Sequence, residues 1–204
     1  MTEKTDVVAT ENDEASSKKK VIAIKKRNTQ ETWTSSRGNK YMFMFTNTHK
    51  VQAMLDTTIR PDGGQSDLLL TKLLMDNILE GNEYDFAYFD KKIANKDKSD
   101  EIILTDEDGE EIATYTFKWP GLLEYQRMLE VAKDANGNVM NSAMFELIME
   151  NVITPKTDWK YWDEHEGYND VMLNAQAFLN RTLQNSEFSE VMGAATDFVN
   201  RKFR

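Results

Sequence analysis

The sequence predicts an α+β fold that is mostly α-helical, built from two tandem repeats of a β-hairpin or strand followed by a helix pair, with two further helices at the C-terminus. Two observations support this fold class. Over most of the chain, apolar residues recur at the three- and four-residue spacing of amphipathic helices. Shorter segments alternate apolar and polar residues around glycine turns, as in residues 101–117, which is typical of β-hairpins.

The composition argues against several classes of function. The chain has 204 residues, a formal net charge of −10 and no cysteine. Phosphates repel such an acidic surface, so general binding to nucleic acid is not expected. The lack of cysteine excludes disulfides, thiol catalysis and thiolate metal sites. No apolar run approaches the roughly 18 residues of a membrane span, and the N-terminus has no apolar signal-peptide core. We therefore expect a cytosolic protein.

The N-terminal part of the chain is strongly charged. Residues 1–17 are polar and acidic and contain no aromatic residue, so we expect this acidic tail to be disordered. Residues 18–27, KKKVIAIKKR, reverse the sign of the charge around a strand-like run at 21–24. A strand with solvated lysines on both flanks is the favoured interpretation. The alternative is a basic patch for nucleic acid or an acidic partner.

Residues 18–98 are predicted to form the first repeat unit. The segment YMFMF, at 41–45, is a strand candidate, and Thr46 or Thr48 is expected to cap the helix that follows it. A second helix is predicted over about residues 67–79. Its inward-facing side chains are expected to be Leu69, Leu70, Leu73, Leu74 and Ile78.

Residues 99–204 are predicted to form the second repeat unit with a C-terminal helical extension. A hairpin over 101–117 is expected to turn at Asp108 and Gly109, since a tight turn requires positive φ. Pro120 then suits the start of a helix. The helices expected in this part of the chain cover about residues 122–129, 141–153, 169–184 and 186–201. The last two have no counterpart in the first unit.

The two units align when the sequence is shifted by 74 positions. Residues 74–78 then fall on residues 148–152. After one deletion in the following turn, residues 85–90 fall on residues 158–163. Identity and spacing agree together, so we interpret the chain as an internal duplication. Asn77 and Asn151 occupy the same position in the segments 74–78 and 148–152. We expect their amides to satisfy carbonyl groups at a helix end.

Aromatic side chains are the residues that we predict to contact a partner. Three of them occur within four residues in both DFAYFD (85–90) and DWKYWD (158–163). Such side chains give large contact areas at low entropic cost. The alternative is that they cover the helices of their own unit. The predicted partner-binding residues are Phe86, Tyr88, Phe89, Trp119, Trp159, Tyr161 and Trp162.

Catalytic and cofactor-binding motifs are absent from the sequence, which has no glycine-rich phosphate loop, no H-E-x-x-H and no G-x-S-x-G. His165 lies among acidic residues at 163–166, but adjacent side chains rarely point at one metal ion, so a solvated loop is favoured. Residues 134–138 open like a calcium loop, yet Phe145 stands where a bidentate Glu is needed. We therefore predict no enzymatic activity, no catalytic residue, no metal and no cofactor.

The second unit carries a series of features that together suggest a family. They are an aromatic strand ending in Pro-Gly, a helix that contains a Gln, the sequence MENVITPK, an aromatic and acidic segment, and a closing helix that ends in FLNR. With these features, residues 115–181 resemble the tail assembly chaperones of bacteriophages that infect Gram-positive bacteria. Members of this family are small, acidic and mostly α-helical. This chain departs from them in its duplication and its long charged N-terminus.

The resemblance implies a function for the chain. It would act in the host cytoplasm as an assembly chaperone that binds the phage tape measure protein, keeps it soluble and helps to recruit the tail tube protein. The alternative is a structural tail or baseplate subunit that is retained in the virion. Less favoured hypotheses are a hydrolase or metal enzyme and an acidic mimic of DNA. Partners other than proteins, such as nucleic acid or membrane, are not expected, and a homo-oligomer is left open.

Overall fold

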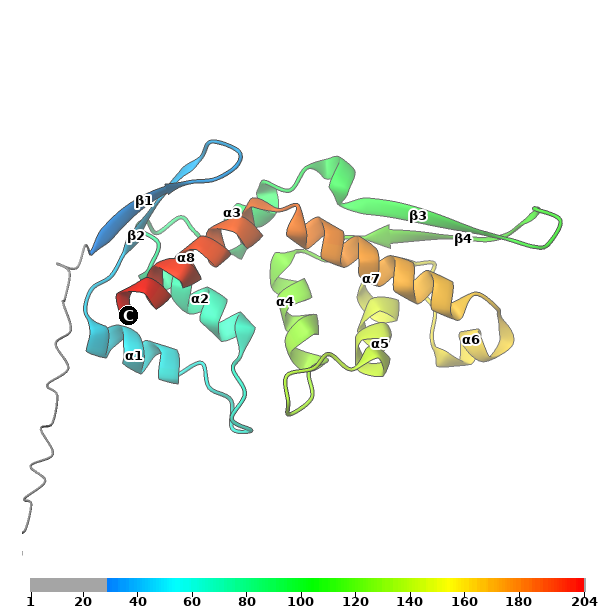
Figure 1. Ribbon diagram of the computed structural model, residues 1–204. Coiled ribbons are helices and arrows are strands. Elements are labelled where there is room, and N and C mark those ends of the chain that lie inside the picture. The colour runs from blue at the N-terminus through cyan, green and yellow to red at the C-terminus, as the bar shows by residue number, and fades with distance from the viewer. Residues whose placement is uncertain (1–28, 204) are drawn as a thin grey trace, which may run out of the picture.

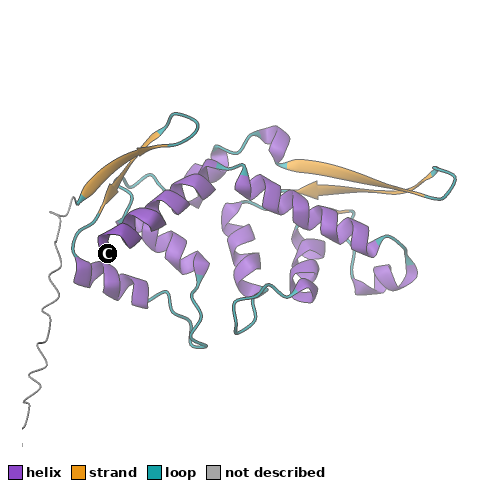
Figure 2. Cartoon of the chain, viewed as in Figure 1, coloured by secondary structure: helices purple, strands orange, loops and turns teal. Residues whose placement is uncertain are grey.

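The computed structural model describes residues 29–203 and shows two lobes side by side in an elongated molecule (Figure 1). Each lobe combines a β-hairpin, two helices, a short aromatic helix and one long helix (Figure 2). The architecture is α+β and mostly α-helical, so the predicted fold class is confirmed. The predicted acidic tail and the basic segment at 18–27 lie outside the described residues.

The first lobe contains the N-terminal hairpin and ends with the last helix of the chain. Its elements, in chain order, are β1 (Gln30–Thr34), β2 (Lys40–Met44), α1 (Thr48–Asp56), α2 (Asp67–Asn77), α3 (Phe86–Lys91), the 3₁₀ helix η1 (Asn95–Asp97) and α8 (Glu187–Phe203). Helix α8 packs against β2, α2 and α3. The first lobe is therefore discontinuous in sequence.

The second lobe lies between the two parts of the first in sequence. Its elements are β3 (Ser99–Thr105), β4 (Glu111–Lys118), α4 (Leu122–Val131), α5 (Asn141–Asn151), β5 (Ile153–Thr154), α6 (Trp159–Glu164) and α7 (Tyr168–Gln184). Strands β3, β4 and β5 form one antiparallel sheet, with β4 in the centre. Helix α7 packs against α5 and the β3–β4 hairpin.

The first hairpin pairs a polar strand with an apolar one. Trp33 of β1 lies opposite Tyr41 of β2, and Gly38 makes the turn between them with a φ of 81°. Only glycine adopts this φ without strain. Strand β1 has no counterpart among the predicted strands, because Trp33 is its one apolar side chain. The predicted turn at Asp108 and Gly109 is confirmed, since Gly109 has a φ of 85° between β3 and β4.

Side chains at the helix starts fix where several helices begin. Asn47 caps α1, because its Oδ1 accepts a hydrogen bond from the backbone N–H of Lys50 at 2.7 Å. The expected cap at Thr46 or Thr48 is wrong, since Thr48 is already the first helical residue. Ser66 caps α2 in the same way by accepting from the backbone N–H of Leu69.

The two aromatic segments are short helices. Asp85 accepts a hydrogen bond from the backbone N–H of Tyr88 at 2.6 Å, and Asp158 accepts one from Tyr161 at 2.7 Å. Both aspartates thus act as N-caps for α3 and α6. The caps turn the chain into a helix, so the three aromatic side chains of each segment point in different directions.

Two apolar clusters form the core, one in each lobe. Tyr41 and Tyr115, which are 74 positions apart, are both buried in their own cluster. The amides of Asn77 and Asn151 donate to the carbonyls four residues earlier in the last turns of α2 and α5. This confirms their predicted role at helix ends. The inward direction expected for Leu69 is wrong, because about half of this side chain is exposed.

The two long C-terminal helices have almost the same apolar face. The segment VMLNAQAFLNR at 171–181 matches VMGAATDFVNR at 191–201 at six of eleven positions, with a shift of 20. Each helix covers a different lobe, so the helical extension predicted for the second unit is divided between both. The common origin of the lobes stays a prediction.

Candidate functional site

A groove opens where the two lobes meet, between α3 of the first lobe and the start of α4 in the second. It has a volume of about 440 Å³. Phe86 and Ala87 line one side, and Pro120, Leu122 and Leu123 line the other. Helices α3 and α4 pack against each other at the boundary where the groove lies. Its surface is therefore largely apolar and belongs to both lobes.

Asp90 of α3 fixes the geometry at the base of the groove. Its Oδ1 accepts hydrogen bonds from the indole Nε1 of Trp119 at 2.7 Å and from the backbone N–H of Leu122 at 3.2 Å. Its Oδ2 lies 3.3 Å from Nζ of Lys98. The carboxylate thus serves as the missing side-chain cap of α4, whose own N-cap residue is Gly121. One residue of the first lobe positions the start of a helix in the second.

Four charged side chains also line the groove. Asp85, Asp90 and Glu124 are acidic lining residues, and Arg127 is the basic one. Arg127 lies 3.5 Å from the carboxylate of Glu124, so its positive charge offsets part of the negative charge of Glu124. Leu123 is 38% exposed and stands in the apolar wall. An apolar wall with an acidic rim suits an amphipathic helix that carries basic residues beside its apolar face.

The predicted partner-binding aromatics fall into different environments. Phe86 is half-buried, lines the groove and lies 5.8 Å from the ring of Phe188. Trp119 is also half-buried and packs against both core clusters, next to Asp90 of the groove. Of the seven predicted residues, these two lie at the junction between the lobes.

The other predicted aromatics lie away from the groove. Phe89 and Trp162 are buried in the core of their lobes, which corresponds to the alternative that such residues cover their own unit. Tyr88 and Tyr161 are half-buried on equivalent positions of α3 and α6. Trp159 is 42% exposed and packs against Tyr168 in the second lobe. The structure therefore does not gather the seven residues into one surface.

Several lining residues of the groove have no predicted role in the sequence. Leu123 is a single apolar residue on the outward side of a helix, and Asp90 is one acid among many. These two residues are far apart in the sequence, so the sequence does not show that both line the same groove. The one local signal was the aspartate at the end of DFAYFD, which recurs in DWKYWD. That signal does not show which partner the carboxylate has.

A cluster of charged and polar side chains lies under the first hairpin. Glu187, at the start of α8, has a side chain that is only 1% exposed. Its Oε1 accepts hydrogen bonds from Ser35 Oγ at 2.5 Å and from Asn39 Nδ2 at 2.7 Å. Its Oε2 lies 3.0 Å from Nζ of Lys92, which also donates to the hydroxyl of Tyr41 at 3.0 Å. The cluster joins β1, β2, α3 and α8.

The protonation states in this cluster follow from its hydrogen bonds. Burial alone would raise the pKa of Glu187, but hydrogen bonds from Ser35, Asn39 and Lys92 outweigh it and lower the pKa from 4.5 to about 2. Burial would likewise lower the pKa of Lys92, whose hydrogen bonds to Tyr88, Tyr41 and Glu187 raise it instead. Both groups are charged at neutral pH. The carboxylate of Glu187 has almost no contact with solvent. Its hydrogen bonds from Ser35 and Asn39 attach α8 to the first hairpin.

The equivalent place in the second lobe is uncharged. The hydroxyls of Tyr115 and Tyr161 are hydrogen-bonded at 2.7 Å, and burial raises the pKa of Tyr115. The ring of His165 stacks on the ring of Tyr161, with centroids 3.9 Å apart. Over residues 29–203, no three histidine or acidic side chains gather in an arrangement that could hold a metal ion. In the same range, no helix has the length and apolar character to cross a bilayer.

Comparisons with protein-family models, with curated proteins and with solved structures each find no match. The groove between the lobes and the sequence features of residues 115–181 are the remaining indications of function.

Proposed function

We propose that the protein is a bacteriophage tail assembly chaperone that acts without enzymatic activity in the cytoplasm of the host cell. In this role it binds segments of the tape measure protein, keeps them soluble and assists assembly of the tail tube. The observation that carries the proposal is the groove between α3 and α4, with its apolar wall and acidic rim. The resemblance of residues 115–181 supplies the class of partner.

The chemistry of the groove suits an extended helical client. Phe86 and Leu123 offer apolar surface to the apolar face of an amphipathic helix. Asp85 and Glu124 are acidic lining residues that can attract basic residues beside that face. A client held in this way has its apolar surface shielded from other clients, and such shielding is what keeps an aggregation-prone helix soluble.

Co-expression with the tape measure protein of the same phage tests the proposal. We expect the tape measure protein to stay in the soluble fraction with this chain and to precipitate without it. Equal precipitation in both cases would contradict the proposal. A cell that expresses an unrelated acidic protein of similar size is the control, because high net charge alone aids solubility.

A second candidate function is that of a structural tail or baseplate subunit. The β3–β4 hairpin favours it, because this hairpin extends beyond the helices of the second lobe (Figure 1) and exposes Ile103 and Ile112. Mass spectrometry of purified particles separates the two candidates. A chaperone that leaves before maturation gives no stoichiometric signal, and a retained subunit gives one.

A further inference from the structure

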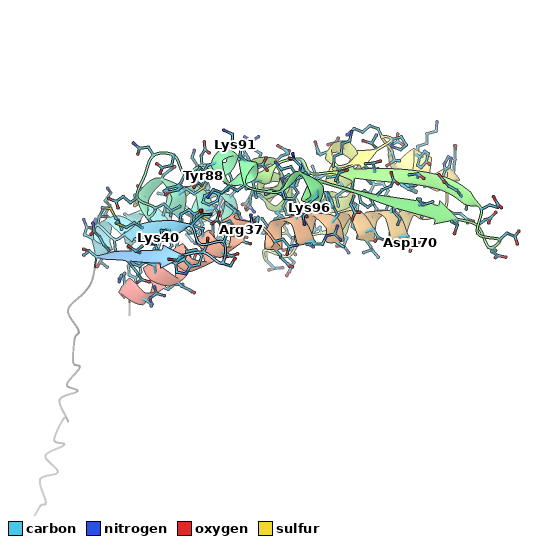
Figure 3. The ribbon with its side chains drawn as sticks, turned by 90° about the horizontal axis from the view of Figure 1, so that it is seen from above. Arg37, Lys40, Tyr88, Lys91, Lys96 and Asp170 are labelled. Atoms are coloured by element: carbon cyan, nitrogen blue, oxygen red, sulfur yellow. The ribbon has the colours of Figure 1, made fainter. Side chains whose placement is uncertain are left out.

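The face of the molecule that carries the two hairpins has opposite charge at its two ends. Figure 3 looks onto this face, with Arg37, Lys40 and Lys91 over the first lobe, Lys96 near the boundary with the second lobe, and the β3–β4 hairpin extending to the other end. We call these four residues the basic end. We call the tip of the β3–β4 hairpin, residues 105–111, the acidic end. The protein as a whole is acidic, so a basic end is not a consequence of composition.

The basic end consists of cations without a carboxylate partner. Within residues 29–203, none of its four members takes part in an ion pair. The guanidinium of Arg37 donates to the backbone carbonyls of Lys92 and Asn185, at 3.1 and 2.5 Å. These carbonyls hold the guanidinium in place without a salt bridge. Hydrogen bonds from Ser36 lower the pKa of Glu190, and the nearby charge of Arg37 adds to this lowering, so Glu190 compensates part of the charge of Arg37.

The acidic end is the counterpart of this patch. Its residues are exposed, and no lysine or arginine occurs between residues 99 and 117. Its acidic members are Asp106, Glu107, Asp108, Glu110 and Glu111. Such an array of like charges repels itself, and a cationic surface relieves that repulsion.

The outer faces of the hairpins also expose apolar side chains. Ile103 is 51% exposed and Ile112 is 63% exposed, on the second hairpin next to the acidic end. Met42 is exposed on the outer face of the first hairpin, next to Lys40. Neither sheet has a covering layer on this face among the described elements (Figures 1 and 3). Apolar surface beside unpaired charge is typical of a contact between proteins.

We propose that this face is the interface of a two-fold symmetric dimer of the chain. In an antiparallel arrangement, the basic end of each copy lies on the acidic end of the other. One rotation then satisfies both ends at once, which is what an isologous interface requires. Ile103 and Ile112 of each copy come to rest on the first hairpin of its partner. The occupant is a second copy because the complementary charges are present on the chain itself.

Salt governs the strength of this dimer. Two chains of net charge −10 repel each other overall, so association depends on the local match between the two ends. Added salt screens exposed charges at distances beyond roughly 10 Å at 0.1 M. We therefore expect the dimer to be favoured at low ionic strength and to dissociate progressively as the salt concentration is raised.

Sedimentation velocity with two charge-reversal variants tests the proposal. The basic-end variant is Lys40→Glu with Lys91→Glu, and the acidic-end variant is Glu107→Lys with Glu110→Lys. Within residues 29–203, none of these four side chains makes a hydrogen bond or ion pair, so the substitutions break no bond of this kind. Each variant alone confronts like charges and should dimerise at least about tenfold more weakly than the unchanged protein.

The mixture of the two variants is the decisive sample. In a mixed dimer, the reversed basic end meets the reversed acidic end, and the two unchanged ends meet each other. Equal amounts of the two variants should therefore form a heterodimer while each remains monomeric alone. A monomeric unchanged protein at low salt would overturn the proposal. It would also be overturned by variants that dimerise normally alone, or by a mixture that stays monomeric.

Discussion

The first turn of the long helix differs between the two lobes, although the apolar faces of α7 and α8 are nearly the same. In the first lobe this turn carries Glu187, which is buried and paired with Lys92. In the second lobe the position 20 residues earlier is Gly167, the N-cap of α7, and the hydrogen bond between Tyr115 and Tyr161 joins β4 to α6. The apolar faces do not distinguish the helices, so we infer that the contacts of Glu187 assign α8 to the first hairpin.

Neither of the two long helices, α7 and α8, could replace the other without a loss of stability. If α7 covered the first hairpin, Lys92 would lose its carboxylate partner and Ser35 would lose its acceptor. If α8 covered the second hairpin, Glu187 would be buried next to tyrosines without a cation, which is costly. A side chain at Gly167 would also meet the side chain of Leu104. Packing supplies the stability of both lobes, and the charged cluster specifies which helix belongs where.

Removal of the buried carboxylate should give the largest effect. The Glu187→Ala variant leaves Lys92 without its partner and Ser35 and Asn39 without an acceptor. We expect the free energy of unfolding to fall by about 2–4 kcal/mol. Urea denaturation followed by circular dichroism measures it. A loss below about 0.5 kcal/mol would show that the cluster behaves like an exposed ion pair and does not hold α8.

Acid should weaken the first lobe through the same carboxylate. The pKa of Glu187 is lowered from 4.5 to about 2, so its contribution is fully present above pH 4.5 and is lost as the pH falls through about 2. The loss amounts to about 3 kcal/mol at the acid end. Unfolding measured between these pH values should depend on pH more steeply for the unchanged protein than for Glu187→Gln. Identical slopes would contradict the assignment.

Substitution of Gly167 should destabilise the second lobe by a smaller amount. Gly167 has a φ of 87°, and an added Cβ would meet the side chain of Leu104, so Gly167→Ala should cost about 1–2 kcal/mol. Gly193 of α8 is the matched control, because it has ordinary helical φ and open space around it. Gly193→Ala should stabilise by about 0.5–1 kcal/mol. Thermal unfolding measures both variants. If Gly167→Ala and Gly193→Ala changed the melting temperature by the same amount in the same direction, this difference between the helices would be contradicted.

Loss of the tyrosine pair should have the smallest effect. Tyr161→Phe removes the hydrogen bond to Tyr115 and keeps the ring that stacks on His165. Because the pair is neutral, we expect a loss of about 1 kcal/mol in the urea experiment. A loss as large as that of Glu187→Ala would mean that the second lobe depends on its polar contact as strongly as the first.

Sequence patterns predict the helices well where apolar spacing is regular. Helices α2 and α5 begin at the expected residues, because three- and four-residue spacing leaves little ambiguity. Strand β1 is harder to predict, since its stability comes from pairing with β2 and one tryptophan. The lobe to which α8 belongs depends on contacts of Glu187 with residues about 150 positions away, as with Ser35. No local pattern contains that information.

The groove could be predicted only in part for the same reason. Phe86 and Trp119 are among the aromatics that the sequence singles out, and both lie at the junction of the lobes. Their neighbourhood depends on Asp90, which connects two helices that are separated by a hairpin. The burial of Phe89 and Trp162 follows from the direction of a capped helix, and composition does not reveal it.

Binding of tape measure segments to two matched leucine variants tests the central claim most directly. Leu123→Asp places a charge in the apolar wall of the groove, whereas Leu173→Asp changes a leucine of α7 that is 55% exposed and lies outside it. Fluorescence titration with labelled segments should show affinity at least about tenfold weaker for Leu123→Asp. It should show unchanged affinity for Leu173→Asp. Equal affinity of both variants and the unchanged protein would contradict the assignment of the groove as the client-binding site.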